Sequence, residues 1–149
     1  MRRLLCWSAL SIGSAMFITG RAASAQGAAP SHKWSAMLLF RGQRGGGEAR
    51  VEPGKRDTES RVRLTMRNLP INVQVAWDVV AGSCGDEGRP VAAAAAFRQV
   101  LSGNDGGGMV SATIPRLTPG QRYYVRVYDP STPPLDAQVF VCANLSEEP

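Results

Sequence analysis

The amino-acid sequence predicts an all-β domain, an antiparallel β-sandwich or flattened Greek-key barrel of seven to eight strands with one disulfide. Three observations lead to this prediction. Apolar and polar residues alternate in several short segments, which is the pattern of strands with one buried face. Turn segments rich in glycine and proline separate these segments at hairpin spacing. Two cysteines remain once an N-terminal export signal is set aside.

The segment 1–25 has the features of a secretory signal peptide. Arg2 and Arg3 precede an apolar stretch that is too short for a stable membrane anchor, and Ala23-Ser24-Ala25 is a small-x-small cleavage signal. A membrane helix is the alternative, but glycines and an arginine interrupt the stretch. We therefore expect an exported protein, periplasmic or extracellular, with no membrane span after cleavage.

Net charge argues against a nucleic-acid partner. Of the 17 lysines and arginines, three lie in the signal segment and none of the 12 acids does, so cleavage reduces the formal net charge from +5 to +2. Such weak basicity does not indicate nucleic-acid binding.

The cysteine count indicates a disulfide between Cys84 and Cys142, because Cys6 leaves with the signal segment. An even pair in an oxidising compartment is typical of a disulfide, and closure of so long a loop stabilises a fold by roughly 4 kcal/mol. Two free thiols or a metal-binding pair are the alternatives. A two-cysteine metal site needs histidine partners, and the mature chain has only His32, which lies in the lead-in.

The mature chain divides into a flexible lead-in at 26–33, a β-sandwich domain at 34–145 and a polar tail at 146–149. We expect Gly45-Gly46-Gly47 to form a plain hairpin loop, and the alanine run 92–96 to form one or two helical turns at most. The predicted strands cover residues 34–40, 48–53, 60–67, 73–80, 97–101, 109–114, 121–128 and 137–141.

Alternation assigns an inward and an outward face to each predicted strand. The inward face of the earlier strands carries Trp34, Ala36, Leu38, Phe40, Val62, Leu64, Met66, Val73, Val75, Trp77 and Val79. Later strands turn Val110, Ala112, Ile114, Tyr123, Val125 and Val127 inward. Their opposite faces carry Gln74, Ala76, Asp78, Val80, Arg122, Tyr124, Arg126 and Tyr128.

The outward face of the segment 60–67 is basic, since Arg61, Arg63 and Arg67 all point away from the core. One interpretation is a surface for an anionic partner, such as an envelope polymer or another exported protein. The other interpretation, which we favour, is a solvated sheet face whose arginines discourage edge-to-edge pairing.

The order of several short motifs resembles secreted domains of the copper/zinc superoxide dismutase-like and CHRD type. These motifs are the segment 47–53, Gly82-Ser83-Cys84-Gly85, Pro119-Gly120 before a tyrosine-bearing strand, and Val141-Cys142-Ala143-Asn144. The resemblance implies a β-sandwich in which the closing cysteine pairs with the first. It also implies that metal-ligand histidines would fall at positions 78, 80 and 128.

The chain departs from that pattern at all three positions, which hold Asp78, Val80 and Tyr128. Copper redox chemistry needs several nitrogen ligands in a fixed geometry, and none of these side chains is an imidazole. Without a structured histidine there is also no Ser–His or Cys–His pair for nucleophilic catalysis. The sequence therefore predicts a non-enzymatic binding or structural domain without metal or cofactor.

A metal-handling or redox protein with a non-standard site is an alternative function. Asp78 and Tyr128 could hold a hard cation, and Met37, Met66 and Met109 could bind copper(I). We expect instead that Asp78 is hydrogen-bonded to a nearby tyrosine or arginine, and that the methionines fill the core.

A fibronectin- or immunoglobulin-like sandwich is the alternative fold. The segment 117–123, Leu-Thr-Pro-Gly-Gln-Arg-Tyr, resembles the turn and tyrosine corner of fibronectin type III domains. Those domains usually lack a disulfide at this place.

Overall fold

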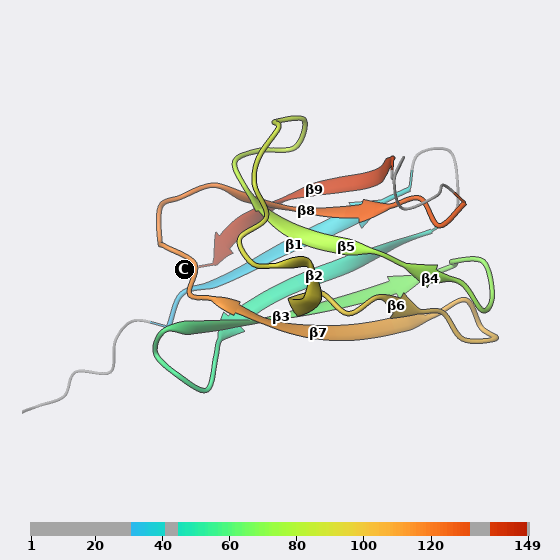
Figure 1. The fold of residues 1–149 in the computed structure, drawn as a ribbon, viewed down its shortest axis with the longest axis horizontal. Helices are drawn as coiled ribbons and strands as arrows, with labels where there is room; N and C mark the ends of the chain where they lie inside the picture. The colour runs from blue at the N-terminus through green and yellow to red at the C-terminus, as the bar shows by residue number, and fades with distance from the viewer. Residues whose placement is uncertain (1–30, 41–44, 132–137, 149) are drawn as a thin grey trace, which may run out of the picture.

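The computed structural model describes residues 31–40, 45–131 and 138–148, which form an antiparallel all-β fold (Figure 1). The predicted signal peptide 1–25 and most of the lead-in lie outside the described residues. The elements are β1 (Lys33–Leu39), β2 (Gly46–Pro53), β3 (Glu59–Arg67), β4 (Gln74–Val75), β5 (Trp77–Ala81), the 3-10 turn η1 (Ala94–Ala96), β6 (Val100–Leu101), β7 (Gly108–Pro115), β8 (Tyr123–Tyr128) and β9 (Val139–Glu148).

Seven strands form one curled sheet in the order β5-β8-β9-β1-β2-β3-β7, and β4 with β6 forms a small second sheet. All pairings within these sheets are antiparallel. Figure 1 shows β7 along the lower margin of the large sheet. The predicted antiparallel all-β class is therefore confirmed.

The inward faces predicted from alternation form the core. The inward residues of β1 and β3 are all buried, and the small sheet adds Val75 and Val100, which have no exposed surface. The ring of Trp77 meets Phe97 edge-on with centroids 5.2 Å apart, which joins β5 to the segment before β6. Full burial of each large apolar side chain stabilises the fold by about 1.5–3 kcal/mol.

The predicted strand at 73–80 is two strands in two sheets. β4 pairs with β6, whereas β5 pairs with β8. Between them, the carbonyl of Ala76 accepts a hydrogen bond from the amide of Tyr128 at 2.9 Å. Alternation continues through this change of partner, and so the pattern alone does not reveal it.

The opposite face of β5 and β8 is covered, although alternation placed it outside. Val80 and Tyr124 are buried there. The segment 82–90 folds back over this face, where the Tyr124 hydroxyl donates to the Asp86 carbonyl at 2.6 Å, and it also pairs with the edge of β5 through a bridge between Val80 and Pro90. Gly88 permits this approach, because a Cβ there would lie 2.3 Å from the Ala81 carbonyl oxygen.

The structure changes the bounds of several other predicted segments. β2 begins at Gly46, so two glycines of the expected hairpin loop pair with β1, and β8 begins at Tyr123. The alanine run forms the single turn η1, within the one or two turns expected, and in the predicted strand 97–101 only β6 pairs. β9 continues to Glu148, into the predicted polar tail, because its last residues pair with β1. Among the described residues no helix is long and apolar enough to cross a membrane.

The predicted disulfide between Cys84 and Cys142 is confirmed. Its two Cα atoms lie 5.8 Å apart, and 58 residues separate the cysteines in sequence. It joins the turn after β5 to β9, with β8 lying between these strands in the sheet. The Cys84 amide also donates to the Asn144 side-chain oxygen at 2.8 Å, which fixes the turn against β9.

Candidate functional site

Asp78 and Tyr128, two of the positions where the resemblance implies metal ligands, lie in direct contact. Asp78 stands opposite Arg126 in the β5–β8 pairing. Arg126 Nε and Nη2 donate to the two Asp78 oxygens at 2.9 and 2.7 Å, and the Tyr128 hydroxyl donates to Asp78 Oδ2 at 2.9 Å. The result is a two-point guanidinium–carboxylate pair with a third donor.

This cluster is shielded from solvent. The side chains of Arg126 and Asp78 are 18% and 11% exposed, and the guanidinium lies 5.9 and 5.6 Å from the ring centroids of Tyr124 and Tyr128. Hydrogen bonding to Asp78 raises the pKa of Arg126. Burial, followed by the hydrogen bond to Asp78, raises the pKa of Tyr128 to about 12. At neutral pH Tyr128 therefore keeps the proton that it donates.

The donor set of this cluster suits a structural ion pair better than a metal. The third position, Val80, is apolar and has no exposed surface. Both Asp78 oxygens already accept hydrogen bonds, and a cation would have to displace Arg126. Within the described ranges no three or more His, Cys, Asp or Glu side chains gather as metal ligands. The geometry agrees with the tyrosine or arginine partner expected from the sequence.

Other potential ligands are dispersed. The expectation that the methionines fill the core is right for Met66 but wrong for Met37 and Met109, which are 68% and 66% exposed. They occupy the outward phase of β1 and β7, two strands that β2 and β3 separate. His32 pairs with Glu147 next to β1, so it does not join the Asp78 cluster.

A cavity of about 570 Å³ adjoins the cluster. Asp78 and Tyr128 line it together with Trp77, Phe97 and the alanines of η1. The carboxylate in the cavity wall belongs to Asp78, which is already paired with Arg126. The cavity therefore offers a mostly apolar wall without an ionised group free to react.

The predicted arginine face lies on the outside of β3. Arg61, Arg63 and Arg67 are exposed, and in the described part of the chain no carboxylate forms an ion pair with any of them. Arg50 on β2 stands directly opposite Arg63 and bonds Glu48 at 2.6 Å. Like charges directly opposite on one sheet face destabilise the pairing.

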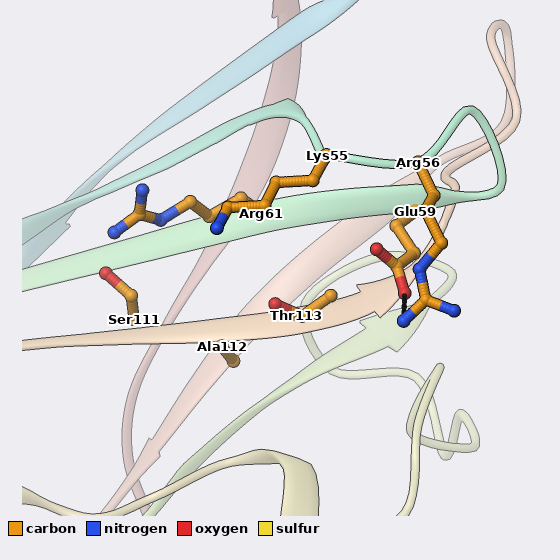
Figure 2. A pocket seen from close by; sticks show the side chains of 8 residues that line it. Lys55, Arg56, Glu59, Arg61, Ser111, Ala112 and Thr113 are labelled. Atoms are coloured by element: carbon orange, nitrogen blue, oxygen red, sulfur yellow. Dashed lines mark ion pairs between the residues drawn. The ribbon is translucent and has the colours of Figure 1, made fainter.

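A basic groove of about 700 Å³ lies at one end of this face (Figure 2). Figure 2 shows the Lys55 and Arg61 side chains reaching over it from the β2–β3 turn and from β3, with the Ser111 and Thr113 hydroxyls on β7 beneath. Arg56 pairs with Glu59 at 3.0 Å instead. Gly54 and Ala112 complete the lining. Two cations and two hydroxyls form a set that suits an anionic ligand.

Sequence reasoning did not identify Arg126 or the two hydroxyls of β7 as site residues. Alternation did place Arg126 on the same face as Tyr128, but the β5–β8 register that sets it opposite Asp78 is not visible in the sequence. Likewise Ser111 and Thr113 fall on the outward phase of their strand, and only the pairing of β7 with β3 brings them beside the arginines.

Comparisons with protein-family models, with curated proteins and with solved structures found no match to this chain. We therefore infer function from the chemistry and geometry of these residues.

Proposed function

We propose that the protein is an exported, non-enzymatic binding or structural domain, similar to superoxide dismutase-like β-sandwiches but without their metal centre. The observation that carries this proposal is the engagement of Asp78 by Arg126 and Tyr128. It occurs where the resemblance implies histidine ligands. A carboxylate whose two oxygens hold a guanidinium and a phenol joins β5 to β8 and is not free to bind a catalytic cation.

Two features support export to the periplasm or the cell exterior. The bond between Cys84 and Cys142 is of the kind that persists in oxidising compartments. The segment 1–25 carries the charged start, apolar stretch and small-residue cleavage signal of an exported chain.

Metal loading of the purified mature protein tests the non-enzymatic proposal. The protein is incubated with copper and zinc salts, dialysed, and measured by elemental analysis and by a superoxide-clearance assay. We expect sub-stoichiometric metal that is the same in the Asp78→Ala variant, and no clearance above the buffer rate. Stoichiometric uptake that depends on Asp78, together with superoxide clearance, would refute the proposal.

A second candidate function is binding of anionic polymers through the arginine face of β3. The observation that favours it is the cluster of arginines on this face, where Arg63 stands directly opposite Arg50 and only Arg50 forms an ion pair, with Glu48. Such a pair becomes favourable when an anion bridges it, because the repulsion is then replaced by two charge-assisted contacts.

The test is salt-dependent binding to a sulfated polysaccharide on a solid support. We expect retention at low ionic strength that weakens as salt screens the charges. Replacement of Arg61, Arg63 and Arg67 by serine should abolish it. The matched control replaces three exposed arginines elsewhere, Arg89, Arg98 and Arg122, and removes the same charge from other faces. Equal losses in both variants would show that net charge, not this face, is responsible.

A further inference from the structure

The hydrogen-bonding phase of β7 can be read from its pairing with β3. The amide of Arg116 donates to the Thr58 carbonyl at 2.9 Å, one step beyond the paired residues Glu59 and Pro115. Bonded and non-bonded pairs alternate along an antiparallel ladder. Ala112 therefore bonds to β3, whereas the backbone N–H and C=O groups of its neighbours at 111 and 113 point away from it.

The pairing of β2 with β3 gives the same phase independently. The amide of Gly54 donates to the Glu59 carbonyl at 2.9 Å, so the odd-numbered residues of β3 bond to β2. The even-numbered residues of β3 then bond to β7, opposite the even-numbered residues of β7. None of the residues that the structure describes hydrogen-bonds the outward backbone groups of Ser111 and Thr113.

The two edges of the large sheet differ. At the β5 edge, the segment that follows the disulfide turn returns to cover the strand: the Val91 amide donates to the Val79 carbonyl at 2.9 Å, and Val80 bridges Pro90. At the β7 edge, β6 lies beside Gly108, but Ser111 to Thr113 line the basic groove. The chain therefore protects one edge with its own backbone and leaves part of the other open.

Charge defines what would fit this open edge. Arg61 stands opposite Thr113 and Arg63 opposite Ser111, all on the outer face. The side chains at 111 and 113 are small, so they leave the guanidinium groups a path across β7 toward anything added beyond it. Lys55 lines the same groove. Among the described residues no carboxylate forms an ion pair with Lys55, Arg61 or Arg63, although Glu52 stands opposite Arg61 on β2.

We propose that β7 accepts an extended acidic segment of a partner protein as an added strand. Its backbone would pair with the outward groups of Ser111 and Thr113, at the usual strand spacing of about 4.8 Å. Alternate side chains of that segment lie on the outer face, where glutamate or aspartate meets Arg61 and Arg63. The inference rests on the anionic-partner proposal above and narrows it from any polyanion to an acidic polypeptide in extended form.

The experiment measures binding of two fluorescent peptides of identical composition. In one, glutamate and threonine alternate; in the other, the glutamates form a single block. We expect the alternating peptide to bind more tightly, and binding to slow amide exchange at 111 and 113. Ser111→Pro removes an outward N–H at an edge position that tolerates proline. It should weaken binding of the alternating peptide about fivefold or more. Ser111→Ala removes the hydroxyl but keeps that N–H, so it should weaken binding of the alternating peptide less than Ser111→Pro does.

The outcomes separate this inference from the function on which it rests. Sulfated polysaccharide retention should survive Ser111→Pro, because it needs the arginines but not the backbone groups. If both peptides bind alike and amide exchange is unchanged while the polysaccharide is retained, strand addition is wrong and the anionic surface stands. If nothing anionic binds at low salt, both are wrong. Concentration-dependent protection of the 111 and 113 amides without peptide would assign the edge to a second copy of the chain and overturn the proposal.

If Ser111→Pro does not fold by circular dichroism, Thr113→Pro and amide exchange in the unsubstituted protein decide the question. An Arg61→Gln variant should weaken binding of the alternating peptide. The binding that remains should depend more strongly on the free backbone edge of β7. The matched control, Arg122→Gln, removes one exposed charge outside the groove. It should leave binding within about twofold of the parent, because salt screens a distant charge.

Discussion

Replacement of Asp78 by alanine should destabilise the protein strongly, because it removes the acceptor of three hydrogen bonds. Two of these come from Arg126 and one from Tyr128. Hydrogen bonds to charged groups contribute about 1.5–3 kcal/mol each, and removal of one partner of a buried pair costs about 3–5 kcal/mol. The Arg126 side chain keeps 18% of its surface exposed and can be partly rehydrated. We therefore expect the free energy of unfolding to fall by about 2–3 kcal/mol, at or just below the lower end of the range for a buried pair.

The assay is urea unfolding of the disulfide-intact protein, followed by tryptophan fluorescence. The midpoint should fall while the slope with denaturant stays the same, because the folded state remains intact. Glu52→Ala, at an exposed carboxylate on β2, is the matched control and should stay within about 0.5 kcal/mol of the parent. The double variant Asp78→Leu with Arg126→Leu should recover most of the loss, because it leaves no unpaired charge. A loss below about 1 kcal/mol for Asp78→Ala, or no recovery in the double variant, would refute the structural role of this cluster.

Two further predictions concern pH and the disulfide. The raised pKa of Tyr128, about 12 in the folded protein against about 10 for a free tyrosine, implies that its contribution to stability is complete below pH ~10 and declines as the pH rises toward 12. Alkaline unfolding of the parent and of Tyr128→Phe should differ in slope across that window, and equal slopes would contradict the assignment. Replacement of Cys84 and Cys142 by serine should lower the free energy of unfolding by about 4 kcal/mol, measured in urea. An unchanged midpoint would contradict the loop-closure reasoning.

The sequence predicted the core faces of β1 and β3 well, because each of these strands has one face on the core and one in solvent. The same reasoning failed for Val80 and Tyr124, which alternation placed outside. Their face is covered by the segment 82–90, a contact between distant parts of the fold that no local period encodes. Where a sheet is buried on both sides, alternation loses its meaning.

The candidate site was predictable in part. Alternation placed Asp78 and Tyr128 on outward faces, and the sequence already indicated an arginine or tyrosine as the partner of Asp78, but the adjacency of β5 and β8 comes from the structure. The basic groove was not predictable, because it depends on β7 lying next to β3. Even the paired residues of these strands that are closest in sequence, Met66 and Gly108, are roughly 40 positions apart in the chain. Strand order is a property of the whole chain and is not written in any one segment.

The central position of β1 has a consequence for how the chain reaches its native state. Lys33 and Trp34 pair with Glu148 and Glu147. The pairing of β1 is therefore complete only after β9, the last strand in the sequence, has joined the sheet. Closing so long a loop is slow, since its entropic cost precedes most of the gain from packing. Until β9 arrives, one side of β1 stays unpaired and open to other chains. During that interval the chain is exposed to aggregation, and a chaperone that holds it unfolded would reduce this risk.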